Sequence, residues 1–192
     1  MAINLISGGV LQKSISKAFP NKATANAVEI LFLLLMGALA MLIHAKLRIP
    51  MHLPGKSGLL FMVFVIMARS SSKFNFGASL TCLGGASLLL MTSLGFDDPF
   101  MPLVYIVLGI IMDLLFGLST LIKPNVFLIS LAAGLSWMCI PILRALIFSV
   151  TGFPYESLIG GMAFPLFTHF IFGAAGGIIG AGIIYGISKS QK

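Results

Sequence analysis

Long apolar runs, separated by short polar breaks that often contain proline, dominate this chain of 192 residues. A window of about 20 residues, the length that a helix needs to cross the hydrocarbon core of a bilayer, predicts six spans. The spans cover residues 27–45, 57–68, 76–94, 101–121, 126–150 and 159–187. These runs are longer than the alternating segments of about ten residues that build membrane β-barrels, so we expect each span to be a helix.

The composition agrees with a protein that lies in a membrane. Hydrophobic residues make up 58% of the chain, charged residues only 9%, and the mean hydropathy is +1.08. Such a chain has too few polar groups to cover a water-soluble globule. We therefore predict an all-α fold, an integral membrane bundle of six transmembrane helices. It divides into an N-terminal interfacial segment (residues 1–26), the bundle (residues 27–188) and a short tail (residues 189–192).

Basic residues predict the orientation, because the cytoplasmic loops of membrane proteins are enriched in lysine and arginine. One side of the six-span arrangement carries eight of these residues, against three in the loops of the other side. The eight are Lys13, Lys17, Lys22, Arg69, Lys73, Lys123, Lys189 and Lys192. We therefore expect both termini in the cytoplasm and the bundle in the plasma (inner) membrane. Because the first three lysines precede a run long enough to cross, we expect no cleaved signal peptide.

The loop between the first two spans, which includes the stretch RIPMHLPGK, runs against this rule. It is predicted to face outside, yet it carries Lys46, Arg48, His52 and Lys56. One interpretation is that the loop is a lid over a small anionic or hydrogen-bonding ligand. The other is that its basic side chains only anchor helix ends among lipid head groups by snorkelling.

Polar and aromatic residues inside the spans are further candidates, because polar groups are costly in a bilayer and are often functional there. Asp113 lies near the middle of the fourth span, whereas Arg144 and His169 lie in the outer halves of the fifth and sixth. Trp137, the only tryptophan, and Tyr105 also belong to the outer half. These positions predict an outward-facing pocket with an aromatic stacking surface and with two hydrogen-bond donors.

A structural role remains open for the same residues. Arg144 would then pair with Glu156 in the following loop or with a lipid head group, and Trp137 would be a packing residue. The outer half of the bundle would in that case hold no ligand.

Glycine spacing in the last span predicts close helix packing. The stretch FGAAGGIIGAGIIYG places small residues four apart, which lets a neighbouring backbone approach closely. A weaker stretch of this kind, MGALA, lies in the first span. The small residues concerned are Gly37, Ala38, Ala40, Gly173, Gly177 and Gly180. Spacing alone leaves open whether the neighbour belongs to this chain or to another protein.

No motif in the sequence indicates catalysis or metal binding. The stretch GKS at residues 55–57 lacks the earlier glycine of a phosphate-binding loop, since Pro50 stands in its place. Cys82 and Cys139 lie within apolar spans, and the three histidines are scattered. We therefore expect neither an enzyme nor a bound cofactor or metal, with a small membrane enzyme as a minor alternative.

The layout of the chain resembles a known family. A first helix rich in small residues, MGALAMLIHAKLRIP, leads into an outer loop and a second helix, GLLFMVFVIMARS. A short basic turn and a glycine-rich third helix follow, and six spans fit into 192 residues. In these features most of the chain resembles the substrate-binding S component of energy-coupling factor (ECF) vitamin transporters.

This resemblance implies a high-affinity site for a vitamin-like solute in the outer half of the bundle, closed by the first loop. It also implies separate partners, a membrane coupling subunit and two ATPase subunits. In that family an AxxxA motif on the first helix faces the coupling subunit. Here the middle of that helix offers Gly37, Ala38 and Ala40, and the strict spacing occurs only at Ala23 and Ala27. The candidate ligand-binding residues are Lys46, Arg48, His52, Lys56, Tyr105, Asp113, Trp137, Arg144 and His169.

Two other functions remain open. The rod-shape membrane protein of the cell-wall elongation machinery has a similar layout, so the chain could be a non-transporting scaffold whose glycine surfaces dock partners. Residues 51–55, MHLPG, also resemble the Met-His opening of cobalt and nickel permeases, although the histidine is internal here. In a scaffold the pocket residues would pack onto one another, whereas in a substrate-binding protein they would surround an enclosed volume.

Overall fold

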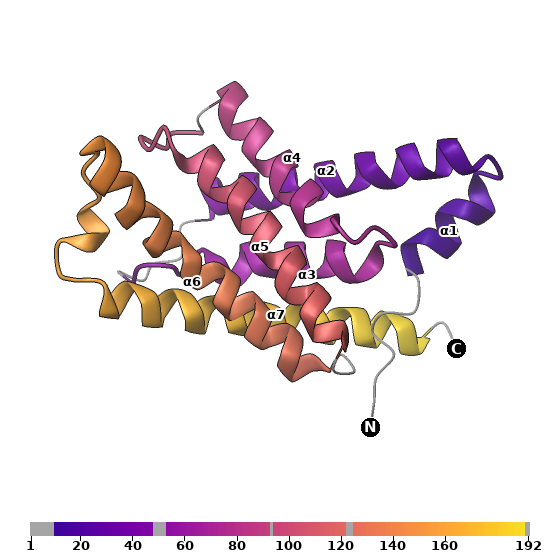
Figure 1. Cartoon of the computed structure of the whole chain (residues 1–192). Helices are drawn as coiled ribbons and strands as arrows, with labels where there is room; N and C mark the ends of the chain where they lie inside the picture. Colours follow the sequence, from indigo (N-terminus) through magenta and orange to yellow (C-terminus); the bar gives the residue numbers. More distant parts are fainter. Residues whose placement is uncertain (1–9, 48–52, 93, 122–124, 191–192) are drawn as a thin grey trace.

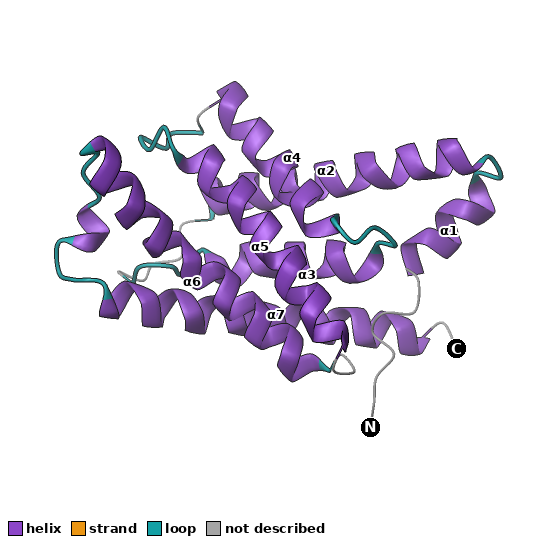
Figure 2. Cartoon of the chain, in the orientation of Figure 1, coloured by secondary structure: helices purple, strands orange, loops and turns teal. Residues whose placement is uncertain are grey.

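The computed structural model describes residues 10–47, 53–92, 94–121 and 125–190. Over these ranges the chain is helical and contains no strand (Figure 1, Figure 2). Its elements are α1 (Val10–Ala18), α2 (Lys22–Lys46), α3 (Gly58–Ser71), α4 (Gly77–Thr92), α5 (Met101–Leu121), α6 (Val126–Thr151), the 3-10 helix η1 (Glu156–Leu158) and α7 (Ala163–Ser190). The predicted all-helical class is confirmed.

Each predicted span coincides with one of the helices α2 to α7. α2 begins earlier than expected, at Lys22, because the Asn21 side chain caps it by accepting a hydrogen bond of 2.9 Å from the Ala23 amide. α7 begins later than expected, at Ala163, because a turn that ends at Gly161, with φ of +96°, takes up the start of the apolar run.

Four helices of the described chain are long and apolar enough to cross a membrane, namely α2, α5, α6 and α7. α3 and α4 are also apolar but have only 14 and 16 residues. At 1.5 Å per residue they extend over roughly 21 and 24 Å, less than the roughly 30 Å of the hydrocarbon core. The apolar helices mark a membrane protein in which two short helices lie among four long ones.

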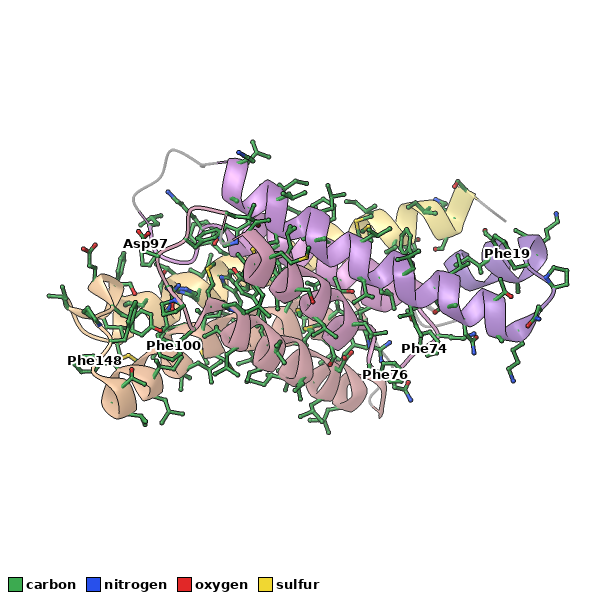
Figure 3. The ribbon with its side chains drawn as sticks, turned by 90° about the horizontal axis from the view of Figure 1, so that it is seen from above. Phe19, Phe74, Phe76, Asp97, Phe100 and Phe148 are labelled. Atoms are coloured by element: carbon green, nitrogen blue, oxygen red, sulfur yellow. The ribbon has the colours of Figure 1, made fainter. Side chains whose placement is uncertain are left out.

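α3 occupies the middle of the bundle, where it contacts α7, α2 and α4 (Figure 1). Consecutive helices from α2 to α7 alternate in direction, so the bundle has two ends. We call the end that holds the start of α2 and the end of α7 the α1 end. The opposite end, where α2 stops and α3 starts, is the first-loop end. In Figure 3, Asp97 and Phe100 lie toward the first-loop end, whereas Phe19 and Phe74 lie toward the α1 end.

α1 folds back against the bundle at the α1 end, where it contacts α2 and α3. Its Ile15 side chain is buried, whereas Lys17 is exposed. This two-faced arrangement suits a helix at a membrane surface. α1 and the first turn of α2 both fall within the predicted interfacial segment, residues 1–26.

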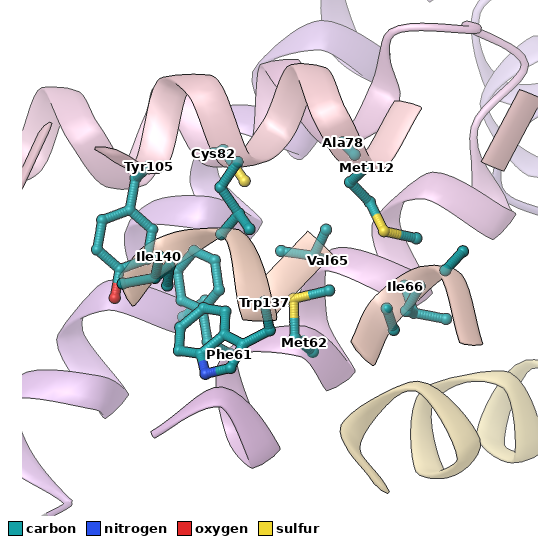
Figure 4. Packing of buried hydrophobic residues seen from close by; sticks show 14 of the residues in the cluster. Phe61, Met62, Val65, Ile66, Ala78, Cys82, Tyr105, Met112, Trp137 and Ile140 are labelled. Atoms are coloured by element: carbon teal, nitrogen blue, oxygen red, sulfur yellow. The ribbon is translucent and has the colours of Figure 1, made fainter. Parts of the chain in front are cut away.

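Buried side chains of α3, α4, α5 and α6 form the core (Figure 4). They include Phe61, Met62, Val65, Ile66, Ala78, Cys82, Tyr105, Met112, Trp137 and Ile140. The long helices α2 and α7 add Ala40, Met41, Ala181 and Ile184 to the same core, so side chains of all six apolar helices meet in it.

The small residues of α2 pack against α4 of the same chain. A Cβ atom added to Gly37 would lie 1.6 Å from the Thr81 carbonyl oxygen, a distance that no side chain could tolerate. Ala40 is buried and Ala38 is half-buried. Close backbone approach therefore occurs here between two helices of one chain.

The small residues of α7 are likewise in contact within the chain. A Cβ atom added to Gly173 would lie 2.5 Å from Trp137 Cβ of α6, and one added to Gly177 would lie 2.7 Å from Ala133 Cβ of the same helix. At Gly180 the nearest atom is the Val63 carbonyl oxygen of α3, 2.9 Å away. These contacts answer the question that spacing left open, because the neighbours of α7 at these glycines are α6 and α3.

Candidate functional site

The connection into α3 packs against α6 and α7 at Gly55. The Gly55 carbonyl accepts a hydrogen bond of 3.0 Å from Trp137 Nε1 on α6. Gly55 has φ of +80°, and a Cβ atom there would lie 2.7 Å from the ring of His169 on α7, so both the turn and the close contact require glycine. His169 lies six residues after the start of α7, roughly 9 Å along that helix. Gly55 therefore lies well below the end of the bundle.

An aromatic cluster lies beneath this connection. The ring centroids of Phe61 and Tyr105 are 4.7 Å apart, those of Phe61 and Trp137 5.6 Å, and those of Trp137 and His169 6.3 Å. Tyr105, Trp137 and His169 are 2%, 1% and 4% exposed, so these rings pack onto one another. The Tyr105 hydroxyl also lies 3.0 Å from Nδ1 of His44 on α2, within hydrogen-bond distance. The structure thus brings three of the predicted site residues together.

Arg144 lies above this cluster, toward the end of α6. Its Nη2 atom is 3.6 Å from Oδ2 of Asp98, in the connection between α4 and α5. Its guanidinium carbon lies 5.4 Å from the ring centroid of Tyr155, whose hydroxyl donates a hydrogen bond of 3.3 Å to Asp98 Oδ1. Burial, and then the charge of Asp98, raise the pKa of Tyr155 to about 12, so this hydroxyl keeps its proton at neutral pH. Arg144 thus pairs with Asp98, whereas the structural alternative had named Glu156 or a lipid head group.

The four basic candidates of the first loop are only partly described. Lys46 is exposed at the end of α2, and Lys56 is half-buried in the turn before α3. Arg48 and His52 lie outside the described residues. The metal-permease interpretation depends on His52, and within the described ranges no three His, Cys, Asp or Glu side chains gather so that they could hold a metal ion.

Asp113 belongs to a different cluster, toward the α1 end. Its carboxylate accepts hydrogen bonds from the Ala78 amide at 3.1 Å and from the amide and hydroxyl of Ser79, both at 2.7 Å. It also lies 2.8 Å from Nε of Arg69 on α3. Because Phe76, before the first residue of α4, has no capping side chain, Asp113 of α5 caps that helix in its place. The structure therefore does not bring Asp113 to the other site residues.

Glu29 of α2 completes the cluster at this end and was not predicted. Its Oε1 atom accepts hydrogen bonds from the Ser72 hydroxyl at 2.7 Å and from the Lys73 amide at 2.9 Å. Its Oε2 atom lies 3.6 Å from Lys73 Nζ, and the side chain is fully buried. Since Glu29 is the one acidic residue in the first predicted span, the rule that singled out Asp113 could have found it.

Two hollows adjoin these clusters. A cavity of about 210 Å³ lies beside Asp98 and has a mainly apolar lining that includes Leu89, Phe96 and Met101. A more open groove of about 580 Å³ lies between α4 and α5, next to Ser79 and Asp113.

Comparisons with protein-family models, with curated proteins and with solved structures gave no match to this chain. Its function must therefore be argued from the geometry alone.

Proposed function

We propose that this chain is the substrate-binding subunit of a membrane transporter, similar to the S component of ECF transporters. In this proposal α2 to α7 all cross the bilayer, the first-loop end faces outside, and both termini lie in the cytoplasm. The site at the first-loop end captures a small anionic or ring-containing solute. Uptake then requires a separate coupling subunit and ATPase subunits.

The position of residues 53–57 carries the proposal. Their backbone is not helical, yet at Gly55 it packs against Trp137 and His169 of two long helices. Irregular backbone at membrane depth is tolerated only where protein or a water-filled cavity surrounds it, and in transporters such backbone often forms the substrate site. The same position supports six crossings, because the connection extends the path of the short α3 toward the first-loop end.

The distribution of exposed charge supports the orientation. Lys17, Lys22 and Lys189 are exposed at the α1 end. The first-loop end presents two exposed acidic residues, Asp97 and Glu156, beside one exposed lysine, Lys46. Lysine-rich ends of membrane helices usually face the cytoplasm, which favours an external site.

Native mass spectrometry of the detergent-purified protein tests this function, because a tight binding protein retains its solute. We expect a bound compound of vitamin size that is lost from Arg144→Ala and kept by Lys17→Ala. The second variant is a matched control, since it removes the same charge at the opposite end. A protein that carries no compound, and gains none from a small-molecule extract of its host cells, would contradict the proposal.

A scaffold function is the second candidate, and the packing of the aromatic cluster favours it. Phe61, Tyr105 and Trp137 fill the space between their helices with their own rings. Under the transporter proposal, a solute must displace residues 53–57 or move these rings. Chemical cross-linking in membranes separates the two functions, because a scaffold would hold a partner subunit without any small molecule and would keep it in Arg144→Ala.

A further inference from the structure

We propose that the side edge of the Arg144 guanidinium, formed by Nε and Nη2, binds the carboxylate of a small solute, and that Asp98 occupies this edge until the solute arrives. This inference rests on the proposed function and names the chemical class of its substrate. It also gives Asp98 a role in selectivity, because only an anion can replace its carboxylate on Arg144.

The ion pair between the two side chains is incomplete. At 3.6 Å the contact between Arg144 Nη2 and Asp98 Oδ2 is too long for a hydrogen bond. Arg144 Nε and Asp98 Oδ2 are both buried, and neither has a hydrogen-bond partner among the described residues. A carboxylate placed squarely on this edge would accept two parallel hydrogen bonds of about 2.7–2.9 Å. The positive charge of this edge therefore attracts an anion, and its Nε donor has no acceptor among the described residues.

Asp98 is held back from closer contact by its other oxygen. Oδ1 accepts a hydrogen bond of 2.9 Å from the Phe100 amide, within its own turn, and the bond from the Tyr155 hydroxyl. These bonds tie the carboxylate to its own turn and to the connection between α6 and α7, where Tyr155 lies. A free carboxylate has no such restraint, so it can make the two bonds that Asp98 cannot.

The surroundings suit the rest of such a solute. The Arg144 and Asp98 side chains are 24% and 14% exposed although Nε and Oδ2 are buried, so in this proposal the edge becomes reachable when Asp98 moves away. The 210 Å³ cavity beside Asp98 offers an apolar lining for a ring or a short alkyl chain. The face of the Tyr155 ring lies against the guanidinium and keeps it in place.

Titration with benzoate tests the inference, with benzamide as the neutral counterpart of the same shape. Binding can be read from the fluorescence of Trp137, which is the only tryptophan and lies roughly 10 Å from Arg144 along α6. Removing the competing anion in Asp98→Asn should tighten benzoate binding about tenfold, since the solute no longer displaces a charge. Asp97→Asn is the matched control, because it makes the same charge change at an exposed neighbour and should leave affinity unchanged. Arg144→Gln should abolish benzoate binding, and benzamide should respond to none of these variants.

A second readout does not depend on the choice of solute. Phenylglyoxal modifies arginine side chains, and peptide mass analysis locates the modified residue. Arg144 should react several-fold faster in Asp98→Asn than in Asp97→Asn, because the edge is no longer covered.

The outcomes separate this inference from the proposed function. If benzoate binds at Arg144 but the two asparagine variants behave alike in both readouts, the role of Asp98 is overturned and the solute site stands. If neither benzoate nor inorganic phosphate binds to any variant, both the anion site and the proposed anionic solute are overturned. If phosphatidylglycerol in the micelle displaces benzoate from the wild-type protein, the occupant is a lipid head group, which overturns the assignment to a soluble solute.

Discussion

Two connections flank the central helix α3, and both contact side chains of the long helices, but they are held in different ways. At the α1 end, Glu29 of α2 accepts hydrogen bonds from Ser72 and Lys73 in the connection itself. Asp113 of α5 binds Arg69 and Ser79 in the helices on either side of this connection. At the first-loop end, Gly55 instead accepts a neutral hydrogen bond from Trp137 and contacts His169.

The difference shows how one bundle can combine an anchor with a movable part. Hydrogen bonds to a buried carboxylate are roughly twice as strong as neutral ones, and breaking them leaves an unpaired charge. A single neutral bond contributes only about 1 kcal/mol, an amount that a bound ligand easily replaces. We infer that residues 72–76 keep the helices in register while residues 53–57 can open.

Asp113→Asn should give the largest effect, because it leaves the 5% exposed Arg69 without its counter-ion. We expect a loss of about 3 kcal/mol in the free energy of unfolding, typical of a broken buried ion pair. Unfolding in detergent with increasing sodium dodecyl sulfate measures it. Ser79→Ala removes only the hydroxyl bond and should cost no more than about 1 kcal/mol. Equal losses in the two variants would show that the ion pair does not anchor this connection.

Gly58→Ala should have an intermediate effect at the other connection. The added Cβ would lie 2.2 Å from Trp137 Nε1, so the indole must move and its bond to Gly55 must lengthen or break. Forcing an extra methyl into such packing costs about 2 kcal/mol. The same unfolding assay measures the loss, and Gly186→Ala is the control, because a Cβ there meets nothing within 4 Å. A Gly58→Ala protein as stable as this control would contradict the packing of the connection on Trp137.

The helices could be predicted because run length and polarity are local properties of a sequence. All six apolar runs gave a helix, and the clearest shifts at their starts came from local signals, the Asn21 cap and the turn at Gly161. The depth of residues 53–57 could not be predicted in this way. It depends on the fit of Gly55 between Trp137 and His169, which are far away in the sequence.

The site was predictable only in part, for a similar reason. Position along a span was enough to place Tyr105, Trp137 and His169 at one end, because a helix rises by a constant distance per residue. It could not reveal Phe61, which resembles every other apolar residue of its span. Nor could it show that Arg144 pairs with Asp98, because that choice depends on the path of a loop.

Trp137→Phe should give the smallest effect and tests the movable connection directly. Phenylalanine keeps an aromatic ring in the cluster but cannot donate to the Gly55 carbonyl, so we expect a loss of roughly 1 kcal/mol in stability. The informative measurement is hydrogen exchange followed by mass spectrometry. Exchange of peptides that contain residues 53–57 should be faster than exchange of those that contain residues 72–76 already in the wild-type protein. The substitution should speed up only the former, about fivefold for this loss of local stability.

The control for this measurement is Glu29→Gln, which weakens the bonds to Ser72 and to the Lys73 amide and should speed exchange only at residues 72–76. If each variant speeds exchange only at its own connection, the two connections open independently. A lid over a ligand site must open in this way. If Trp137→Phe accelerates exchange at both connections equally, they open as one unit. The contrast between an anchor and a movable part would then be wrong, and the closed packing of the aromatic cluster would favour the scaffold function.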